Sequence, residues 1–381
     1  MGRNGGIGVL RIRSAHPAVP AHPACPARSM LHRFSQFLAG CTVLLILAGS
    51  LVTSHDAGLS VPDWPTSYGW NMFTFPPSMW VANILYEHGH RLIASSVGFL
   101  TIVLATWLWT SEPRAWLRWL GVAALGAVIA QGVLGGLTVL FFLPPAVSTA
   151  HAGLAEIFFC LTVAIALFTS PAWIQEDNTD PDRRAADGTL RRLATTTTVL
   201  VYGQILIGAA MRHTGAGLAI PDFPLMFGGI VPDHWTPAIA VHFAHRLGAV
   251  IVSAFVVTTV SLVWARRPQR RDLTRPALIL VALVAIQVTL GALTVVSRRD
   301  PWINSFHVVC GALVLATSLV ITLRTWRVKF AAASVRLKPD TTEDYVGGVR
   351  LGSDQSVGSV RLQPDQIAGS VQLQPDHRGQ A

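Results

Sequence analysis

Eight long apolar segments constrain the fold of this chain more than any other feature. They cover residues 34–53, 88–110, 115–141, 148–169, 194–211, 238–264, 276–297 and 304–326. Each is long enough to cross the roughly 30 Å of hydrocarbon in a bilayer as a helix. Because no water reaches the bilayer core, a spanning segment must satisfy its own backbone hydrogen bonds, as a helix does. Charged residues make up only 13% of the chain, against about 25% in soluble domains. We therefore expect an all-α membrane protein with eight transmembrane helices.

The basic residues gather in alternate connections between these segments. They lie before the first segment, between the second and third, the fourth and fifth, and the sixth and seventh, and after the eighth. Loops 54–86 and 142–147 contain no Lys or Arg, and the pair Arg298 and Arg299 is the exception. The positive-inside rule then places both termini in the cytoplasm. We expect a multi-pass protein of the cell inner (plasma) membrane, whose net charge of +9 sets orientation and does not indicate nucleic-acid binding.

Several motifs recur at a nearly constant spacing. GLSVPDWP at 58–65 matches GLAIPDFP at 217–224, and QGVLGGLTV at 131–139 matches QVTLGALTV at 287–295. The spacings, 159 and 156 residues, are almost the same, and histidines described below recur at 155 and 156. Since each copy holds an even number of segments, the copies share one orientation in the membrane. The sequence therefore predicts two parallel four-helix-bundle repeats.

This pattern divides the chain into five expected parts. They are a disordered basic leader (1–29), an N-terminal four-helix bundle (30–172), a cytoplasmic linker (173–193), a C-terminal four-helix bundle (194–330) and a disordered repetitive tail (331–381). The tail repeats VRLKPD, VRLGSD, VRLQPD and VQLQPD. It has too few bulky apolar residues to form a core, which is typical of disorder.

Four histidines occupy matching places in the two halves, near the outer ends of the even-numbered segments: His90, His151, His245 and His307. An ionisable group at membrane depth is costly and often functional, and facing helices of a bundle commonly hold cofactor ligands. No Cys or carboxylate completes a tetrahedral zinc set in each half. Two imidazoles suit the axial positions of a heme iron. The alternative is a histidine hydrogen-bonded to a neighbouring helix.

Charged residues beside these histidines suggest further roles. Arg91 and Arg246 each follow a histidine and could pair with heme propionates, although a snorkelling arginine is the alternative. Glu87 lies three residues before His90, on the same helix face, whereas His242 occupies the matching place in the second half. A carboxylate near only one heme indicates unequal roles for the halves, unless it simply favours the helix dipole.

The remaining outer histidines are expected to be solvated or in contact with propionates, and they are His55, His88, His213, His234 and His242. The two PDWP and PDFP loops are stiffened by paired prolines. We expect each to cap a heme pocket from the aqueous side.

Together these features resemble the heme A synthase family over about residues 30–330. The resemblance rests on EHGHR (87–91), His151, HFAHR (242–246), His307 and the paired loops. It implies an oxidoreductase that converts a methyl group of heme O to a formyl group, giving heme A for cytochrome oxidase assembly. The implied partners are the heme O substrate, heme O synthase, an unidentified electron carrier and membrane lipid.

The resemblance also implies roles for single residues. His245 and His307 would ligate the iron of a resident heme b, the implied cofactor. His90 and His151 would ligate the substrate heme, and Glu87 would be catalytic. Many bacterial members carry a cysteine pair in the first outer loop, but loop 54–86 has no cysteine here.

Two other functions fit parts of the pattern. A bis-histidine heme b electron-transfer protein would hold two permanent hemes and give Glu87 no role. A parallel-repeat transporter could use the histidines to relay protons, but it would place polar groups and broken helices near the membrane midplane.

Overall fold

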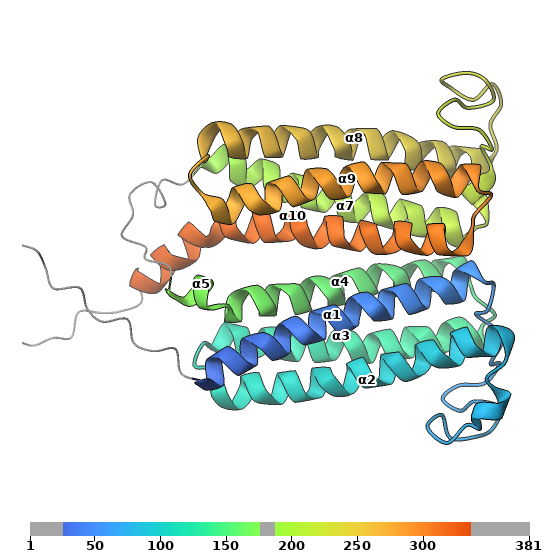
Figure 1. The fold of residues 1–381 in the computed structure, drawn as a ribbon, viewed down its shortest axis with the longest axis horizontal. Helices are drawn as coiled ribbons and strands as arrows, with labels where there is room; N and C mark the ends of the chain where they lie inside the picture. Colours follow the sequence, from blue (N-terminus) through green and yellow to red (C-terminus); the bar gives the residue numbers. More distant parts are fainter. Residues whose placement is uncertain (1–25, 176–186, 337–381) are drawn as a thin grey trace, which may run out of the picture. The chain divides into compact units, whose positions relative to one another are not determined.

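The computed structural model describes residues 26–175 and 187–336, which are all helical apart from turns and loops (Figure 1). The eight predicted membrane segments are confirmed as eight long apolar helices. They are α1 (Pro26–Ser54), α2 (Ala82–Ser111), α3 (Ala115–Leu140), α4 (Pro145–Thr169), α7 (Gly188–His213), α8 (Pro237–Arg266), α9 (Arg271–Val296) and α10 (Pro301–Arg336). Short helical turns are η1 (Pro77–Met79), α5 (Pro171–Gln175) and η2 (Ala216–Leu218).

The helices run beyond the apolar segments at several ends. α1 begins at Pro26, inside the expected leader, and α10 continues to Arg336, inside the expected tail. α5 and the first turns of α7 occupy both ends of the expected linker 173–193. The length of an apolar segment reflects the thickness of the bilayer. A helix can extend beyond that segment into polar flanking residues where its end is stabilised. Proline suits the first turn, and the Asp187 side chain caps α7 by accepting from the Leu190 N–H at 3.0 Å. The rest of the leader, linker and tail lies outside the described residues.

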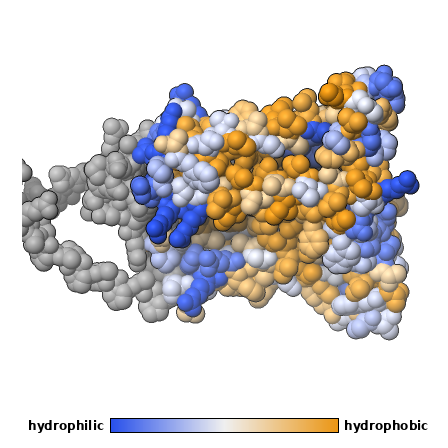
Figure 2. Space-filling view, turned by 45° about the horizontal axis from the view of Figure 1, so that its top comes forward, coloured by the Kyte–Doolittle hydropathy of each residue, from blue (hydrophilic) through white to orange (hydrophobic). Residues whose placement is uncertain are grey.

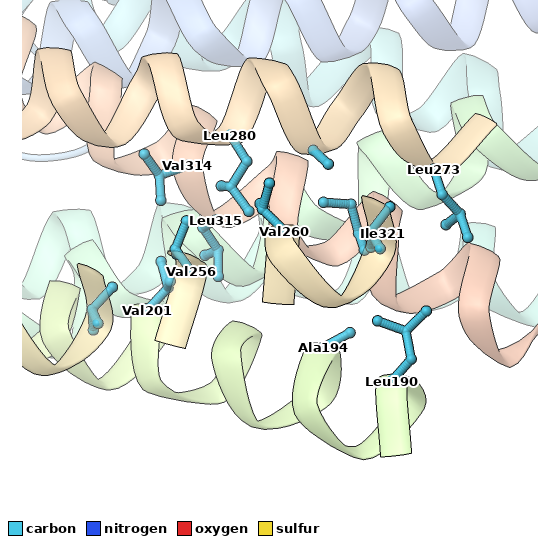
Figure 3. Packing of buried hydrophobic residues seen from close by; sticks show 13 residues of the cluster. Leu190, Ala194, Val201, Val256, Val260, Leu273, Leu280, Val314, Leu315 and Ile321 are labelled. Carbon is cyan, nitrogen blue, oxygen red and sulfur yellow. The ribbon is translucent and has the colours of Figure 1, made fainter. Parts of the chain in front are cut away.

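The helices form two groups of four (Figure 1). In the first group, α1 packs on α2 and α4, and α3 also packs on α2 and α4. Its core holds Leu38, Leu104, Leu108, Leu117 and Ile165. The second group, α7 to α10, buries an equivalent core, which includes Val256, Val260, Leu280, Leu315 and Ile321 (Figure 3).

The two groups meet along α4, α7 and α10. α4 packs on α7, and Phe159 of α4 joins Ala312 and Ala316 of α10 in a small buried cluster. Arg212 of α7 also donates to the backbone oxygen of Ser50 in α1 at 2.7 Å. The face drawn in Figure 2 is broadly hydrophobic around the helices and hydrophilic toward their ends, as expected for a multi-pass membrane protein.

The two long loops, 55–81 and 214–236, lie at the same end of the helices (Figure 1). Each contains a two-residue turn closed by one backbone bridge, Ser67 with Trp70 and Met226 with Gly229. The turn glycines, Gly69 and Gly228, both have positive φ, which glycine adopts without steric cost. These features recur 159 residues apart, which is compatible with the predicted duplication.

Candidate functional site

His245 of α8 and His307 of α10 face each other across the second helix group. Their ring centroids are 6.4 Å apart and their planes make an angle of 69°. Two imidazoles that bind one metal ion from opposite sides lie about 6 Å apart, because each metal–nitrogen bond is about 2 Å long. The described residues contain no group of three or more His, Cys, Asp or Glu that could hold a metal ion. The pair therefore fits a heme iron, which receives its other four nitrogen ligands from the porphyrin.

Neighbouring glutamines hold these two rings from behind. The Gln204 amide of α7 lies 3.0 Å from Nδ1 of His245 and donates to the His245 backbone oxygen at 2.7 Å. The Gln287 amide of α9 lies 3.3 Å from Nε2 of His307. These contacts restrain the orientation of both rings, and in each the amide nitrogen can only donate.

His90 of α2 and His151 of α4 lie in the first helix group, at the places that match His245 and His307. The two rings are close enough to interact electrostatically. Nδ1 of each ring is buried and has no hydrogen-bond partner among the described residues. The structure thus brings the four predicted histidines together as two pairs, each built from the second and fourth helix of its group.

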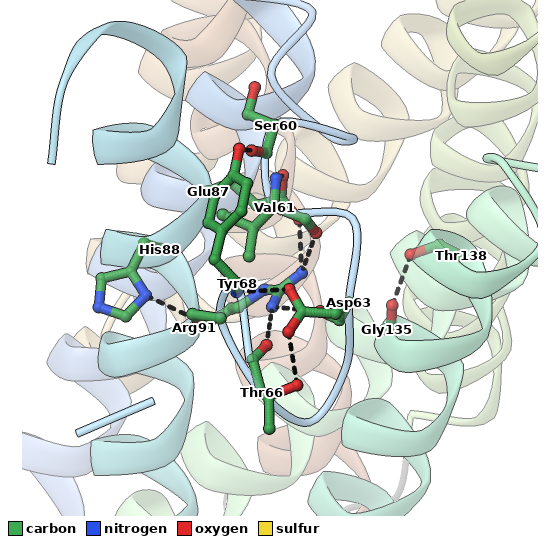
Figure 4. Close-up of polar contacts among 11 residues, drawn as sticks. Ser60, Val61, Asp63, Thr66, Tyr68, Glu87, His88, Arg91, Gly135 and Thr138 are labelled. Atoms are coloured by element: carbon green, nitrogen blue, oxygen red, sulfur yellow. Dashed lines mark hydrogen bonds and ion pairs between the residues drawn. The ribbon is translucent and has the colours of Figure 1, made fainter. Parts of the chain in front are cut away.

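Glu87 and Arg91 of α2 bind the first outer loop (Figure 4). The Glu87 carboxylate accepts from the Val61 N–H at 2.8 Å and from Arg91 at 2.7 Å. The Arg91 guanidinium also donates to the carbonyls of Val61, Asp63 and Thr66 at 2.7 to 2.9 Å. Glu87 is only 3% exposed, so this is a buried ion pair that clamps the loop onto the helix.

His242 and Arg246 of α8 make the same clamp in the second half. Nδ1 of His242 lies 3.2 Å from the Ile220 N–H and Nε2 lies 3.1 Å from Nε of Arg246, and a neutral imidazole can accept from only one of these donors. Arg246 donates to the carbonyls of Ile220, Asp222 and Leu225 at 2.7 to 3.0 Å. His242 therefore replaces Glu87 as the acceptor at this position. The loop carbonyls engage both guanidinium groups, so propionate binding by either arginine would require exchange of partners.

Two of the outer histidines, which were expected to be solvated or in contact with propionates, are buried. His88 is fully buried, with Nδ1 3.1 Å from the Ser67 hydroxyl and its ring against Phe75 and Trp80. His242 is 2% exposed. Both support the loops, whose folded path sequence reasoning did not foresee.

The other outer histidines lie nearer the surface. His55 stacks on Tyr86 with ring centroids 4.0 Å apart, and the exposed His234 pairs with Asp233 at 2.6 Å. His213 at the end of α7 is half-buried and interacts electrostatically with Arg212 and His151.

The first outer loop reaches α3, the helix before the one that carries His151. The Trp64 indole lies so close to Gly136 of α3 that a Cβ atom there would be 2.6 Å from its Cδ2 atom. Asp63 orders the neighbouring turn by accepting from Thr66 at 2.5 Å, Tyr68 at 2.7 Å and Gly69 at 2.8 Å. Burial alone would raise the pKa of Asp63, but these hydrogen bonds outweigh it and lower the pKa below 3.8. The loop is thus a built cover at the outer end of the first group.

Glu156 is a buried polar residue that sequence reasoning missed. It lies on α4, is 4% exposed, and has one carboxylate oxygen without a hydrogen-bond partner in the described part of the chain. Its neighbours by electrostatic interaction are Cys160 and Tyr202. The signal was present, since a carboxylate inside an apolar segment is itself unusual.

The fold defines a class of protein: a multi-pass membrane protein of eight long helices, in which each group of four carries two histidines on its second and fourth helices. Residues 32–319 match the model of a family described as cytochrome oxidase assembly protein. The chain belongs to this family, which is the heme A synthase family.

Several curated relatives carry the name heme A synthase. The one from Symbiobacterium thermophilum is 33% identical over 67% of this chain and 83% of its own length. The one from Shouchella clausii is 29% identical over 75% of this chain and 92% of its own. A third, from Geobacillus kaustophilus, is 26% identical over 80% of this chain and 96% of its own.

Proposed function

We propose that this protein is a heme A synthase, an oxidoreductase that converts a methyl group of heme O to the formyl group of heme A. The observation that carries the proposal is the 6.4 Å separation of the His245 and His307 rings, which suits one iron and no larger cluster. Family membership supports the reaction. The conversion takes its oxygen atom from water and releases protons and electrons.

We assign the second helix group to a resident heme b, ligated by His245 and His307. Heme b would supply one-electron redox chemistry when bound. The protein's own contribution there is to hold both imidazoles, through Gln204 and Gln287, and to shield them from water with the loop held by Arg246. These contacts suit a heme that stays in place.

We assign the first helix group to the substrate heme, ligated by His90 and His151. Glu87 lies one helical turn from His90, roughly 4.5 Å along the axis. Its carboxylate is the proposed catalytic group: it can accept a proton from the reacting methyl carbon or from an attacking water. A fixed negative charge also stabilises positive charge that develops on that carbon. The ion pair with Arg91 holds the carboxylate in one position.

The proposed surroundings follow from the same model. Arg91 and Arg246 would reach the propionates when their loop carbonyl contacts exchange. Heme O synthase would supply the substrate, and an unidentified electron carrier would remove electrons. We place the protein in the cell inner (plasma) membrane with both termini cytoplasmic, so that both heme sites lie near the outer face.

One observation favours a second candidate, a bis-histidine heme b electron-transfer protein. Because His242 makes the same loop clamp as Glu87, Glu87 has a structural role that needs no catalysis. Co-expression with a source of heme O, followed by acid-acetone extraction and chromatography, separates the two functions. The synthase produces heme A. Unchanged heme O, with heme b bound in both halves, would instead identify an electron carrier.

A further inference from the structure

Each of the four paired histidines lies against a glycine of a neighbouring helix. Glycine has no Cβ atom, and a Cβ added at Gly49, Gly135, Gly208 or Gly291 would be in close contact with an imidazole ring. The nearest ring atom is Cε1 in all four cases: of His90 at 2.9 Å, His151 at 3.2 Å, His245 at 2.8 Å and His307 at 3.0 Å. All four distances are shorter than ordinary van der Waals contact, which begins near 3.4 Å.

The ring edge that faces each glycine is the same. Nδ1 is the second nearest atom and Nε2 the third, for example 3.2 and 3.6 Å from the Cβ position at Gly208. The Cε1 edge of the ring, with a nitrogen on either side of it, therefore faces the glycine in every pair. A helix of larger residues would push the ring away and turn it.

The glycines follow the duplication as closely as the histidines do. Gly49 and Gly208 are 159 residues apart, and Gly135 and Gly291 are 156 apart. Each glycine lies on the helix that precedes its histidine's helix in the chain: Gly49 on α1, Gly135 on α3, Gly208 on α7 and Gly291 on α9. Three of the four glycines, all but Gly49, have a glutamine four residues before them in the sequence, at positions 131, 204 and 287. Other glycines of the same helices, Gly40, Gly132 and Gly203, have nothing within 4 Å of the Cβ position.

We infer that Gly49, Gly135, Gly208 and Gly291 are positioning residues for heme ligation, which rests on the proposed function of the two sites. The missing Cβ lets each imidazole stand with its Cε1 edge against helix backbone. The angle of 69° between the His245 and His307 planes is then set by where the two glycines lie. This angle governs the anisotropy of the low-spin electron paramagnetic resonance signal of a bis-histidine heme, so the glycines carry a spectroscopic signature.

The test compares matched alanine variants of the full-length protein, purified in detergent. Gly208→Ala and Gly291→Ala should weaken retention of the resident heme by about tenfold to a hundredfold, the usual effect of disturbing the support of a metal ligand. The heme that remains should show a shifted low-spin resonance. Gly203→Ala, on the same helix as Gly208, should keep wild-type heme content and the wild-type resonance.

The variants of the first helix group provide their own folding control. Gly49→Ala and Gly135→Ala should keep the resident heme spectrum, which reports a folded protein, and bind added heme O about tenfold or more weakly. Gly40→Ala and Gly132→Ala should bind heme O normally. If the four ligand-facing variants keep wild-type heme content, affinity and resonance, the positioning role is wrong. If the wild-type protein itself holds no heme, the proposed function fails instead.

Discussion

The variant Glu87→His offers the sharpest test of the proposed catalytic residue. His242 already performs the structural work of Glu87 in the second helix group, in contact with a loop N–H and with an arginine. Glu87→His copies that arrangement into the first group and removes only the carboxylate. The two roles of Glu87 can therefore be measured separately.

The structure gives the scale of each role. Glu87 makes two buried hydrogen bonds, to Val61 and Arg91, and hydrogen bonds to charged groups contribute about 1.5–3 kcal/mol each. A neutral imidazole accepts through one nitrogen only, so Glu87→His keeps one of the two bonds and the clamp weakens by about 1.5–3 kcal/mol. Loss of an electrostatic catalytic group typically costs about a hundredfold to a thousandfold in rate. We therefore expect Glu87→His to make less than a hundredth of the wild-type heme A.

The assay is the ratio of heme A to heme O after extraction, normalised to the resident heme. Limited proteolysis of loop 55–81 reports whether the clamp holds. Glu87→Ala, which removes both bonds, should open the loop as well as stop the reaction. The reciprocal variant His242→Glu should leave heme A production within a few fold. If Glu87→His keeps a tenth or more of the activity with an intact loop, Glu87 is a structural clamp and the catalytic assignment is wrong.

Four further outcomes are expected. His245→Ala and His307→Ala should each remove the low-spin absorbance of the resident heme from purified protein, and full absorbance in both would refute that site. Reporter fusions after residues 70 and 230 should be extracytoplasmic, and fusions after 180 and 270 cytoplasmic; the reverse pattern would invert the topology. Gly136→Ala should lower heme A formation severalfold while leaving the resident heme intact, because the new Cβ would lie 2.6 Å from Trp64; an unchanged yield would mean that Trp64 does not cover the substrate. The hydrogen bonds that lower the pKa of Asp63 stabilise the loop above pH 3.8, and this stabilisation is lost as the pH falls through the lowered pKa. The protease resistance of loop 55–81 should fall over that pH range in the wild type but not in Asp63→Asn. A parallel fall in both would contradict the assignment.

Local patterns accounted for the helices and for the histidine pairs. Hydropathy within a segment such as 115–141 determines whether it enters a bilayer, so the eight helices could be predicted one by one. The pairing of His245 with His307 could be predicted because a duplicated sequence implies a duplicated contact. Helix ends at Pro26, Gly188 and Arg336 could not, because they depend on capping and on packing outside the lipid.

The contacts of Glu87 lay beyond prediction for a different reason. Its partner Val61 is 26 residues away in a loop, and no local rule gives the path of that loop. The arginines were read as propionate partners because the loop carbonyls that engage them were not visible in the sequence. The glycines opposite the histidines, by contrast, recur at the spacings of the repeats and could have been found from Gly49 and Gly208 alone.

What differs between the halves is concentrated on the side assigned to the substrate. The four histidines and the glycines that face them recur in both groups, which is why we propose a heme in each. Around them, the first group has Glu87 in place of His242, Trp64 in place of Phe223 and Gly136 in place of Ala292. The first change adds a negative charge within one turn of a ligand, and the other two seat a larger aromatic ring of the cover on α3. A resident heme needs neither a charge nor a distinctive cover, whereas a substrate heme needs a group to react with and a cover that closes over it. The asymmetry thus follows the division of labour that the proposed function requires.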